Sequence, residues 1–426
     1  MSASGLPSRV VHFFRTLGPG LITGAADDDP SGISTYSVTG ATTGYSLLWL
    51  TFISTPMMAV IQGMCARISM VTGEGLATLM RKRLPRSLMY PLAALVIVAN
   101  TFNIGADIGG MAAAAKLLIP IPVEVWVMFF GIALIAAQVW LSYNMIASVF
   151  KWLTVVLFAY VITAFIAHPP WAQVLSGFVI PTVHFQSQWL STMVAILGTT
   201  ITPYLFFWQS AEMVEEEKKA GHATVASRRG TDERSIKDAH TDINAGMIYS
   251  NIVAAFIIVT TAATLGAHGK HNIATAQDAA EALRPLAGNF AALLFTLGMV
   301  GTGVLAVPVL ATSSAYVAAE TFRFREGLSE KPSRARQFYA VIVAGIIIGV
   351  IMDLLKINPI KALFWSAILN GVAAVPLIAV IVWLASNDSI MREWRSSRVA
   401  VAWGWFSVTL MGAATLGMFY FMATGG

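Results

Sequence analysis

The chain has 426 residues, of which 56% are hydrophobic and only 12% are charged. Soluble globular domains carry about 25% charged residues, so this composition excludes a water-soluble protein and indicates a membrane protein. The net charge of +5 comes from basic residues in short interhelical segments, which argues against nucleic acid as a partner. A single cysteine, Cys65, excludes an intrachain disulfide and a thiolate metal cluster.

The apolar stretches predict eleven transmembrane helices, because a spanning helix needs about 20 mostly apolar residues. In chain order the predicted spans are 17–40, 46–70, 88–115, 122–141, 144–167, 189–210, 243–266, 287–319, 337–355, 359–384 and 399–422. The segment before the first span lacks the apolar core and small-residue ending of a signal peptide, so we expect no cleavage there.

The distribution of basic residues predicts the orientation of the chain. With the N-terminus in the cytoplasm, 22 of the 27 Lys and Arg residues lie on the cytoplasmic side and five lie outside. Short cytoplasmic loops are enriched in Lys and Arg. We therefore expect an integral protein of a prokaryotic cytoplasmic (inner) membrane, with the N-terminus inside and the C-terminus outside.

The first predicted helix is interrupted by Gly24-Ala-Ala-Asp-Asp-Asp-Pro-Ser-Gly32. Pro30 lacks an amide donor and clashes with the preceding turn, and the glycine two residues later weakens the helix further. Freed carbonyls and carboxylates at membrane depth predict a cation site, with Asp29 as the main ligand. For Asp27 and Asp28 the sequence leaves two roles open, a functional one or a position facing a water-filled vestibule.

Two further polar residues lie inside predicted helices three and seven. Asp107 fits a transport role or a structural hydrogen bond equally well, and Asn251 fits either helix packing or metal binding. None of the seven histidines is placed in mid-membrane, which argues against a histidine proton relay.

The sixth predicted helix is interrupted in the same way, at Leu197-Gly-Thr-Thr-Ile-Thr-Pro-Tyr204. One mid-membrane proline usually makes only a kink. Breaks at corresponding positions of two five-helix groups instead favour an inverted-repeat transporter with its site at the midplane. We predict one transmembrane transporter domain over 1–426, with repeats at 17–167 and 189–384 and an extra helix at 399–422.

The chain resembles the Nramp family of divalent metal transporters over nearly its whole length. The resemblance rests on Gly18–Ile22, the Asp29-Pro30 break, Gly44–Trp49, Gln62–Arg67 with Val71–Gly73, and Ser386-Asn387 with Met391. It implies an all-α polytopic membrane protein of eleven transmembrane helices, a LeuT-like 5+5 inverted repeat with broken helices one and six. We expect a monomer in the lipid bilayer, with a divalent metal ion as substrate, no cofactor and no enzymatic activity.

The resemblance also implies metal-site residues at both breaks. The family binds its metal through Asp and Asn of an Asp-Pro-Gly-Asn motif, and through Met and a backbone carbonyl of an Ala-x-x-Met-Pro-His motif. Here Asp29 matches the Asp, and Gly32 replaces the Asn. Thr199 falls at the carbonyl position, Thr202 replaces the Met, and Tyr204, on the predicted pathway, replaces the His.

Other family positions fall on neighbouring helices. Gln62 matches a family Gln in helix two, where it is predicted to support the metal site together with Asp28. Along the pathway, Asp107 fits one of two helix-three acids. A helix-ten glutamine position falls on Ser366, with Asn370 one turn later.

The departures from the family pattern change the predicted ion. A thioether favours transition metals, whereas Thr202 offers only oxygen, and an all-oxygen site suits Mg²⁺ and Mn²⁺. Mg²⁺ keeps several bound waters. We expect Gly32 to leave room for those waters and the carboxylates of Asp27 and Asp28 to hydrogen-bond to them. This pattern resembles the Nramp-related magnesium transporter branch.

Proton coupling is the remaining question. Tyr204 and Gln209 replace both helix-six histidines, and Gly110 replaces one helix-three acid, so we expect uptake without proton coupling. The alternatives are a proton-coupled Mn²⁺/Fe²⁺ Nramp transporter and a Na⁺-coupled amino-acid transporter of the same fold. The acid cluster argues against the amino-acid transporter, because it would repel a substrate carboxylate. The sequence also lacks the His-Glu-x-x-His and Gly-x-Ser-x-Gly motifs of hydrolases.

Overall fold

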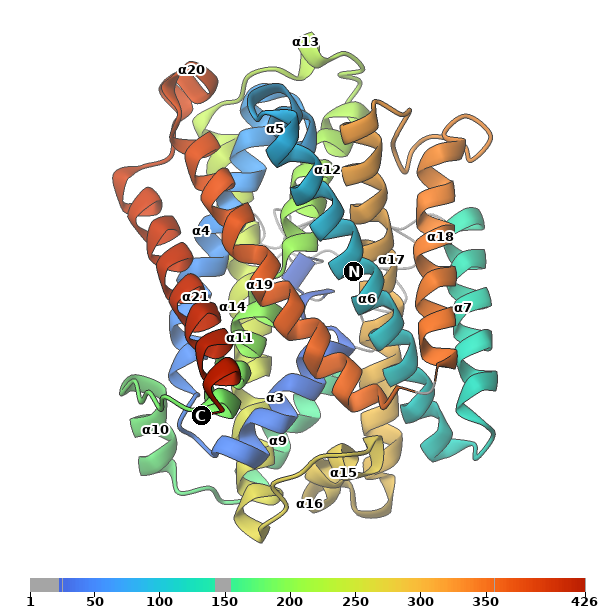
Figure 1. The fold of residues 1–426 in the computed structure, drawn as a ribbon, viewed down its shortest axis with the longest axis vertical. Coiled ribbons are helices and arrows are strands. Elements are labelled where there is room, and N and C mark those ends of the chain that lie inside the picture. The colour runs from blue at the N-terminus through green and yellow to red at the C-terminus, as the bar shows by residue number, and fades with distance from the viewer. Residues whose placement is uncertain (1–22, 25, 142–154, 356, 426) are drawn as a thin grey trace, which may run out of the picture.

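The computed structural model describes residues 23–24, 26–141, 155–355 and 357–425. These residues fold almost entirely into helices, and no strand is assigned among them. Most of the long helices run roughly along the long axis of the molecule (Figure 1). A helical bundle satisfies its backbone hydrogen bonds internally, as a chain in lipid must.

Eight long helices are continuous. They are α4 (Trp49–Thr72), α6 (Arg86–Leu118), α7 (Val123–Trp140), α14 (Glu233–Thr264), α17 (Ala291–Phe322), α18 (Arg336–Leu354), α19 (Pro359–Ser386) and α21 (Arg398–Thr424). Three shorter helices border the breaks, namely α3 (Pro30–Thr43), α11 (Ser187–Thr200) and α12 (Pro203–Lys219). Short helices lie between them: α5 (Leu76–Arg83), α9 (Phe158–Ile166), α10 (Trp171–Val179), α13 (Val225–Arg228), α15 (Ala276–Ala280), α16 (Arg284–Ala287) and α20 (Asp388–Met391).

Nine segments of the described chain are long and apolar enough to cross a membrane. They confirm nine of the eleven predicted spans, with α11 and α12 together forming the sixth. In the first predicted span, α3 has only 14 residues, and the residues before 23 lie outside the described part. Residues 144–154 of the fifth predicted span lie outside it too, and α9 lies in the remainder of that span. The total of eleven therefore stays a prediction.

Both predicted helix breaks are present, and each one ends at a proline. Residues 26–27 are helical, Asp28 and Asp29 are not, and α3 begins at Pro30. In the same way α11 ends at Thr200 and α12 begins at Pro203. Proline is favoured in the first turn of a helix, where its missing N–H would be unpaired anyway. Each proline therefore starts the second half of a broken helix.

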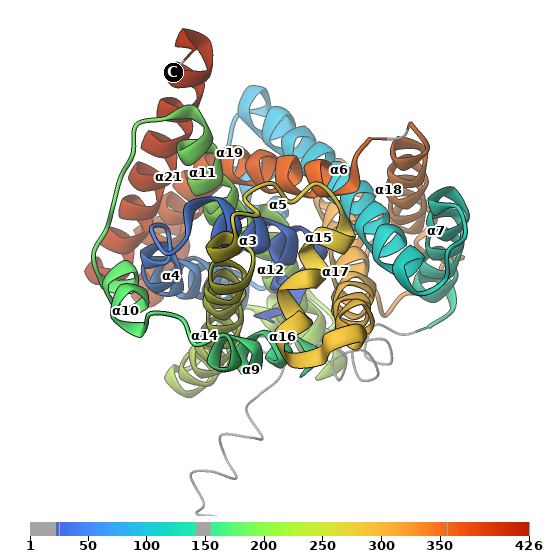
Figure 2. The same cartoon turned by 90° about the horizontal axis from the view of Figure 1, so that it is seen from below.

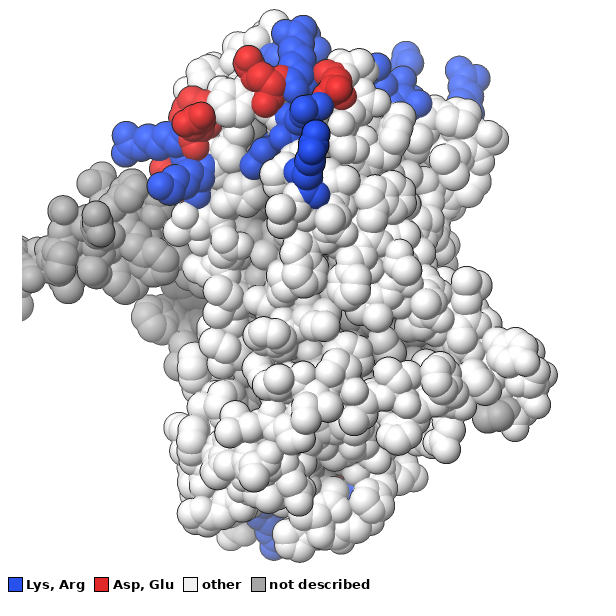
Figure 3. Space-filling view, turned by 90° about the vertical axis from the view of Figure 1, so that its left-hand side faces the viewer, with Lys and Arg blue, Asp and Glu red and all other residues white. Residues whose placement is uncertain are grey.

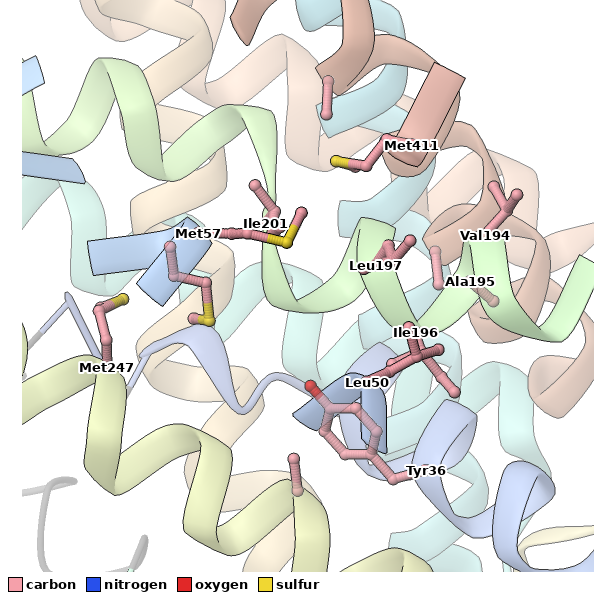
Figure 4. Packing of buried hydrophobic residues seen from close by; sticks show 14 of the residues in the cluster. Tyr36, Leu50, Met57, Val194, Ala195, Ile196, Leu197, Ile201, Met247 and Met411 are labelled. Atoms are coloured by element: carbon pink, nitrogen blue, oxygen red, sulfur yellow. The ribbon is translucent and has the colours of Figure 1, made fainter. Parts of the chain in front are cut away.

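The broken helices occupy the interior of the bundle. In the span formed by α11 and α12, 94% of its 18-residue apolar stretch is buried inside the protein. The buried share of the corresponding stretch is only 28% in each of α7, α18 and α21. Seen from below, α3 and α12 lie among the longer helices, with α7 and α21 at the periphery (Figure 2). Figure 4 shows the packing near the second break, where Tyr36, Met57, Ile196 and Met247 come from four different helices. The interior position means that atoms freed at the breaks face protein rather than lipid.

Charged side chains gather at one end of the molecule. On the face shown in Figure 3, Lys, Arg, Asp and Glu cluster at the end that carries α5, α13 and α20, and a wide uncharged band lies below. Helix α5 alone ends in Arg81, Lys82 and Arg83. The last helix, α21, ends toward the opposite end of the molecule (Figure 1). Which side of the membrane this end faces stays a prediction.

Close packing between α11 and α19 holds the second break in place, and Gly198→Ala tests this contact. A Cβ on Gly198 would overlap the Ala367 carbonyl oxygen and the Gly371 amide nitrogen. We expect destabilisation by about 1–3 kcal/mol, seen as a lower thermal unfolding midpoint in detergent. Gly412→Ala is the matched control, because its Cβ would meet only Val375 Cγ1 at 3.6 Å. Equal midpoints for the two variants would contradict this account.

Candidate metal-transport site

Asp29 forms the N-cap of α3 at the first break. Its Oδ1 accepts hydrogen bonds from the Gly32 amide and the Ser31 hydroxyl, each at 2.7 Å, and its Oδ2 accepts one from Asn103 Nδ2 at 3.1 Å. An aspartate before a helix stabilises the free first-turn amides. These three hydrogen bonds fix the orientation of the carboxylate, and a carboxylate still has lone pairs for a further ligand.

Asp27 and Asp28 share one hydrogen-bond donor. Ser250 Oγ, on α14, lies 2.7 Å from Asp27 Oδ2 and 3.1 Å from Asp28 Oδ1. A hydroxyl carries a single hydrogen, so it satisfies one carboxylate at a time. The other two oxygens, Asp27 Oδ1 and Asp28 Oδ2, are buried and have no hydrogen-bond partner in the part of the chain that the structure describes. A bound cation would satisfy both.

Asp107 supplies a fourth carboxylate from α6. It lies one helical turn beyond Asn103, and its charge interacts with that of Asp29. Among the described residues, neither of its carboxylate oxygens has a hydrogen-bond partner, and both are buried. The choice between a transport role and a structural one stays open.

Each proline at a break frees a carbonyl four residues earlier, because it has no N–H to donate. Pro30 frees the Ala26 carbonyl, which accepts a hydrogen bond of 3.0 Å from the Tyr204 hydroxyl. Pro203 frees the Thr199 carbonyl, which accepts no hydrogen bond from the described residues. The ligand role of the Thr199 backbone oxygen stays a prediction, as does the place of Tyr204 on the pathway. The Tyr204 hydroxyl links the two breaks.

The space beside Gly32 corrects one prediction. A Cβ on this residue would lie 3.2 Å from Thr199 Oγ1, 3.3 Å from Tyr36 Cε2 and 3.5 Å from Asp29 Oδ1. Protein atoms already fill the place where we expected Gly32 to leave room for metal-bound water. The Gly32 amide donates a hydrogen bond to Asp29. Because Gly32 has no side chain, α11 can approach α3 closely. Gly32 also lies inside the first turn of α3 and not at the break itself.

The other predicted positions differ in how they relate to the breaks. Thr202 lies at the second break, and its Oγ1 is buried without a partner. Gln62 Oε1 and both side-chain polar atoms of Asn370 are also buried and unpartnered. Ser366 donates to the Leu363 carbonyl of its own helix at 2.7 Å. Among described residues, no hydrogen bond joins Gln62, Ser366 or Asn370 to the carboxylates, so their roles stay predictions.

Burying four carboxylates costs folding free energy unless a cation balances their charge. The side chains of Asp27, Asp28, Asp29 and Asp107 are all 0% exposed. Within the described ranges no Lys, Arg or His side chain forms an ion pair with them, and no three His, Cys, Asp or Glu side chains converge as a complete metal site. An unpaired buried carboxylate costs several kcal/mol or more. A divalent cation with hydroxyl, carbonyl and water ligands would offset that cost.

Two residues at the site were missed by the sequence reasoning. Asn103 could have been found as a polar residue one turn before Asp107 on the same helix. Ser250 directly precedes Asn251, which was considered, but a serine in an apolar helix is too common to stand out. Asn251 itself accepts a 2.9 Å hydrogen bond from Ser54 Oγ on α4, which supports its packing role.

The hydrogen bond across the two breaks can be tested with Tyr204→Phe. This change removes the donor to Ala26 and leaves a buried carbonyl without a partner, which costs about 1–3 kcal/mol. We expect a lower unfolding midpoint in detergent. Tyr420→Phe removes the same hydroxyl from a side chain that is 63% exposed, and it should leave the midpoint unchanged. An unchanged midpoint in the Tyr204 variant would show that this hydrogen bond does not hold the breaks together.

Comparison with known proteins places the chain in a family. Residues 20–421 match the family model described as "Natural resistance-associated macrophage protein-like", or Nramp. The chain is 27% identical over 353 residues to the divalent metal cation transporter MntH of Brucella suis, covering 80% of this chain and 73% of that protein. It is 28% identical over 328 residues to MntH of Agrobacterium fabrum, covering 74% and 67%.

Solved structures show the same fold. The manganese transporter of Eremococcus coleocola, solved with an aromatic bis-isothiourea compound, superposes with a TM-score of 0.74 at 20% identity, covering 98% of this chain and 90% of that one. MhsT with bound L-phenylalanine has a TM-score of 0.60 at 12% identity, covering 94% and 97%. These likenesses confirm the predicted LeuT-like fold. The family match extends over nearly the whole chain, and the chain therefore belongs to the Nramp family, as an integral membrane transporter rather than an enzyme.

Proposed function

We propose that this protein carries Mg²⁺, and also Mn²⁺, across the cytoplasmic membrane by alternating access and without proton coupling. The relatives named above are divalent metal cation transporters, which supports a divalent metal as the substrate. The choice of a hard ion rests on the chemistry of this chain's own site.

The supporting observation is a buried cluster of oxygen atoms that lack partners. Within the described ranges, Asp27, Asp28, Asp107 and Thr202 each have at least one such oxygen, and the Thr199 carbonyl at the second break accepts no hydrogen bond. The observed side-chain hydrogen bonds to the carboxylates come from Ser and Asn, not from a sulfur or an imidazole. Hard oxygen ligands suit Mg²⁺ and Mn²⁺, whereas soft ions such as Cd²⁺ prefer sulfur.

Transport follows from the position of this cluster between two broken helices. An ion at the breaks would neutralise the carboxylates while the surrounding helices rock about it and open the site to one side at a time. Mg²⁺ would keep part of its water shell, and the free oxygens of Asp27 and Asp28 would accept hydrogen bonds from those waters. Asp29, already fixed by three donors, would bind the ion directly.

The replaced histidines support transport without protons. Tyr204 donates its hydroxyl hydrogen to a carbonyl, and Gln209 Oε1 lies 3.3 Å from the hydroxyl of Thr23. Neither position carries a group that titrates near neutral pH. A proton-coupled Mn²⁺ transporter is the second candidate, favoured by Asp107, whose two unpartnered oxygens could take a proton instead of a cation.

The same proposal includes topology and assembly. We propose two inverted repeats at 17–167 and 189–384 with an extra helix at 399–422, a monomeric unit, and the N-terminus on the cytoplasmic side. The gathering of basic side chains at the end with α5, α13 and α20 supports this orientation.

Liposomes separate the two candidates. Purified protein is reconstituted with a Mg²⁺-sensitive dye in one preparation and a pH-sensitive dye in another, and Mg²⁺ or Mn²⁺ is added outside. We expect saturable influx of both ions with no change of internal pH beyond that of empty liposomes. Proton influx that accompanies metal influx would overturn uncoupled transport, and Mn²⁺ influx without Mg²⁺ influx would overturn the proposed substrate.

A further inference from the structure

A groove at the cytoplasmic end of α4, α14 and α21 has the form of a lipid site. It encloses about 380 Å³ and is bordered by residues of all three helices. Helix α4 packs against both α14 and α21 at one edge of the bundle (Figures 1 and 2). The groove is separate from the carboxylate cluster at the helix breaks.

One end of this groove is cationic because it holds Arg67. Arg67 donates through Nη2 toward His240 Nε2 at 3.0 Å and through Nη1 to the Arg395 carbonyl at 3.3 Å. No carboxylate forms an ion pair with Arg67 among the described residues. The α21 N-terminus, capped by Ser397, adds first-turn amides beside the same end. An anion would satisfy this half-buried guanidinium.

Packing holds the cationic end in a fixed geometry. The ring of His240 lies against Gly63, where an added Cβ would be only 2.6 Å from the ring carbon Cε1. Gly63 therefore allows α14 to place an imidazole next to Arg67. Such a site is built into the helix contact and does not depend on mobile surface side chains.

The rest of the groove is apolar and runs along one stripe of α4. Pro56, Ala59, Val60 and Met64 line it at helical spacing, and Trp403 of α21 lies opposite. From Pro56 to Arg67 the helix rises about 16 Å, close to the roughly 15 Å of one leaflet's hydrocarbon layer. The groove thus matches a single acyl chain with an anionic headgroup at the cytoplasmic interface, where Trp side chains are common.

We infer that this groove binds an anionic phospholipid of the cytoplasmic leaflet. Arg67 and the first-turn amides of α21 hold the phosphate, His240 holds the Arg67 guanidinium in position, and the stripe from Pro56 to Met64 holds one acyl chain. The bound lipid fixes α21 against α4 and α14. A zwitterionic phospholipid fits the apolar stripe but leaves its own cationic group beside Arg67, so it binds more weakly.

Thermal unfolding of the purified protein in detergent, with native mass spectrometry, tests the inference. Phosphatidylglycerol should bind saturably at one site and raise the unfolding midpoint by about 3 °C or more. Phosphatidylcholine should give less than half of that shift. In Arg67→Gln the affinity for phosphatidylglycerol should fall about tenfold. Lys331→Gln is the control, because it removes an exposed charge from the same end of the molecule but outside the groove.

Two further variants keep the test decisive if Arg67→Gln folds poorly. His240→Gln should weaken the binding of phosphatidylglycerol severalfold, and Ala59→Trp should abolish it by filling the groove without a change of charge. Equal binding of both lipids, or unchanged binding in Ala59→Trp and His240→Gln, would overturn the inference. An equal midpoint shift with glycerol phosphate or inorganic phosphate alone would identify a free anion as the ligand and would also overturn it.

Discussion

Asp29→Ala should reduce Mg²⁺ influx into liposomes by about ten- to a hundredfold. A charged ligand contributes about 1.5–3 kcal/mol to such a site, which corresponds to that range. Asp29 is also the N-cap of α3, so the alanine variant should lose about 0.5–2 kcal/mol of stability as well. A loss of Mg²⁺ influx in this variant would therefore combine lost metal binding with lost protein stability.

Asp29→Asn separates the two effects. The amide oxygen can still accept hydrogen bonds from Gly32 and Ser31, while the negative charge is gone. We expect near-normal stability with the same loss of flux. Asp388→Asn, on the exposed α20, removes a carboxylate from another helix N-terminus and should transport normally. Normal Mg²⁺ influx in Asp29→Ala would refute the metal site.

Thr202→Met should change the ion that the protein prefers. It brings a thioether to a buried position whose hydroxyl has no hydrogen-bond partner among the described residues. We expect Cd²⁺ to compete with Mn²⁺ at least about tenfold more strongly, a difference of about 1.4 kcal/mol, while Mg²⁺ influx falls. The measurement is inhibition of Mn²⁺ influx by Cd²⁺ in liposomes.

Thr202→Val is the matched control for this change. It removes the same hydroxyl, nearly preserves the shape and adds no sulfur, so it should lower Mg²⁺ influx without any gain for Cd²⁺. If the valine and methionine variants responded to Cd²⁺ alike, the sulfur would not set selectivity, and residue 202 would lie outside the metal's coordination sphere.

The breaks themselves could be predicted from the sequence because of what precedes each proline. Pro30 follows Asp29 and Pro203 follows Thr202, and both preceding residues take the N-cap position of a new helix. Pro308 follows a valine and stays inside the continuous helix α17. A polar residue before the proline does not mark a break by itself, because Thr55 precedes Pro56 inside the continuous helix α4. The breaks are marked by the longer polar runs before the proline, three aspartates before Pro30 and Gly198 with three threonines before Pro203.

The surroundings of the carboxylates could not be predicted in the same way. Ser250 lies 223 residues from Asp27 along the chain, and only the packing of α14 against α3 brings them together. The expected water space beside Gly32 was wrong for a related reason. The position of α11 is set by its contact with α19 at Gly198, and this contact brings Thr199 against Gly32. Periodicity and motifs do not encode such long-range contacts.

One measurement tests the central claim, that the carboxylates at the helix breaks hold the transported ion. Crystals of the protein soaked in Mn²⁺ would show the ion by its anomalous scattering. We expect a peak within about 2.5 Å of Asp29 and the Thr199 carbonyl, with Asp28 and Thr202 beside it. Strong Mn²⁺ peaks elsewhere in the protein, with none between α3 and α11, would contradict the account.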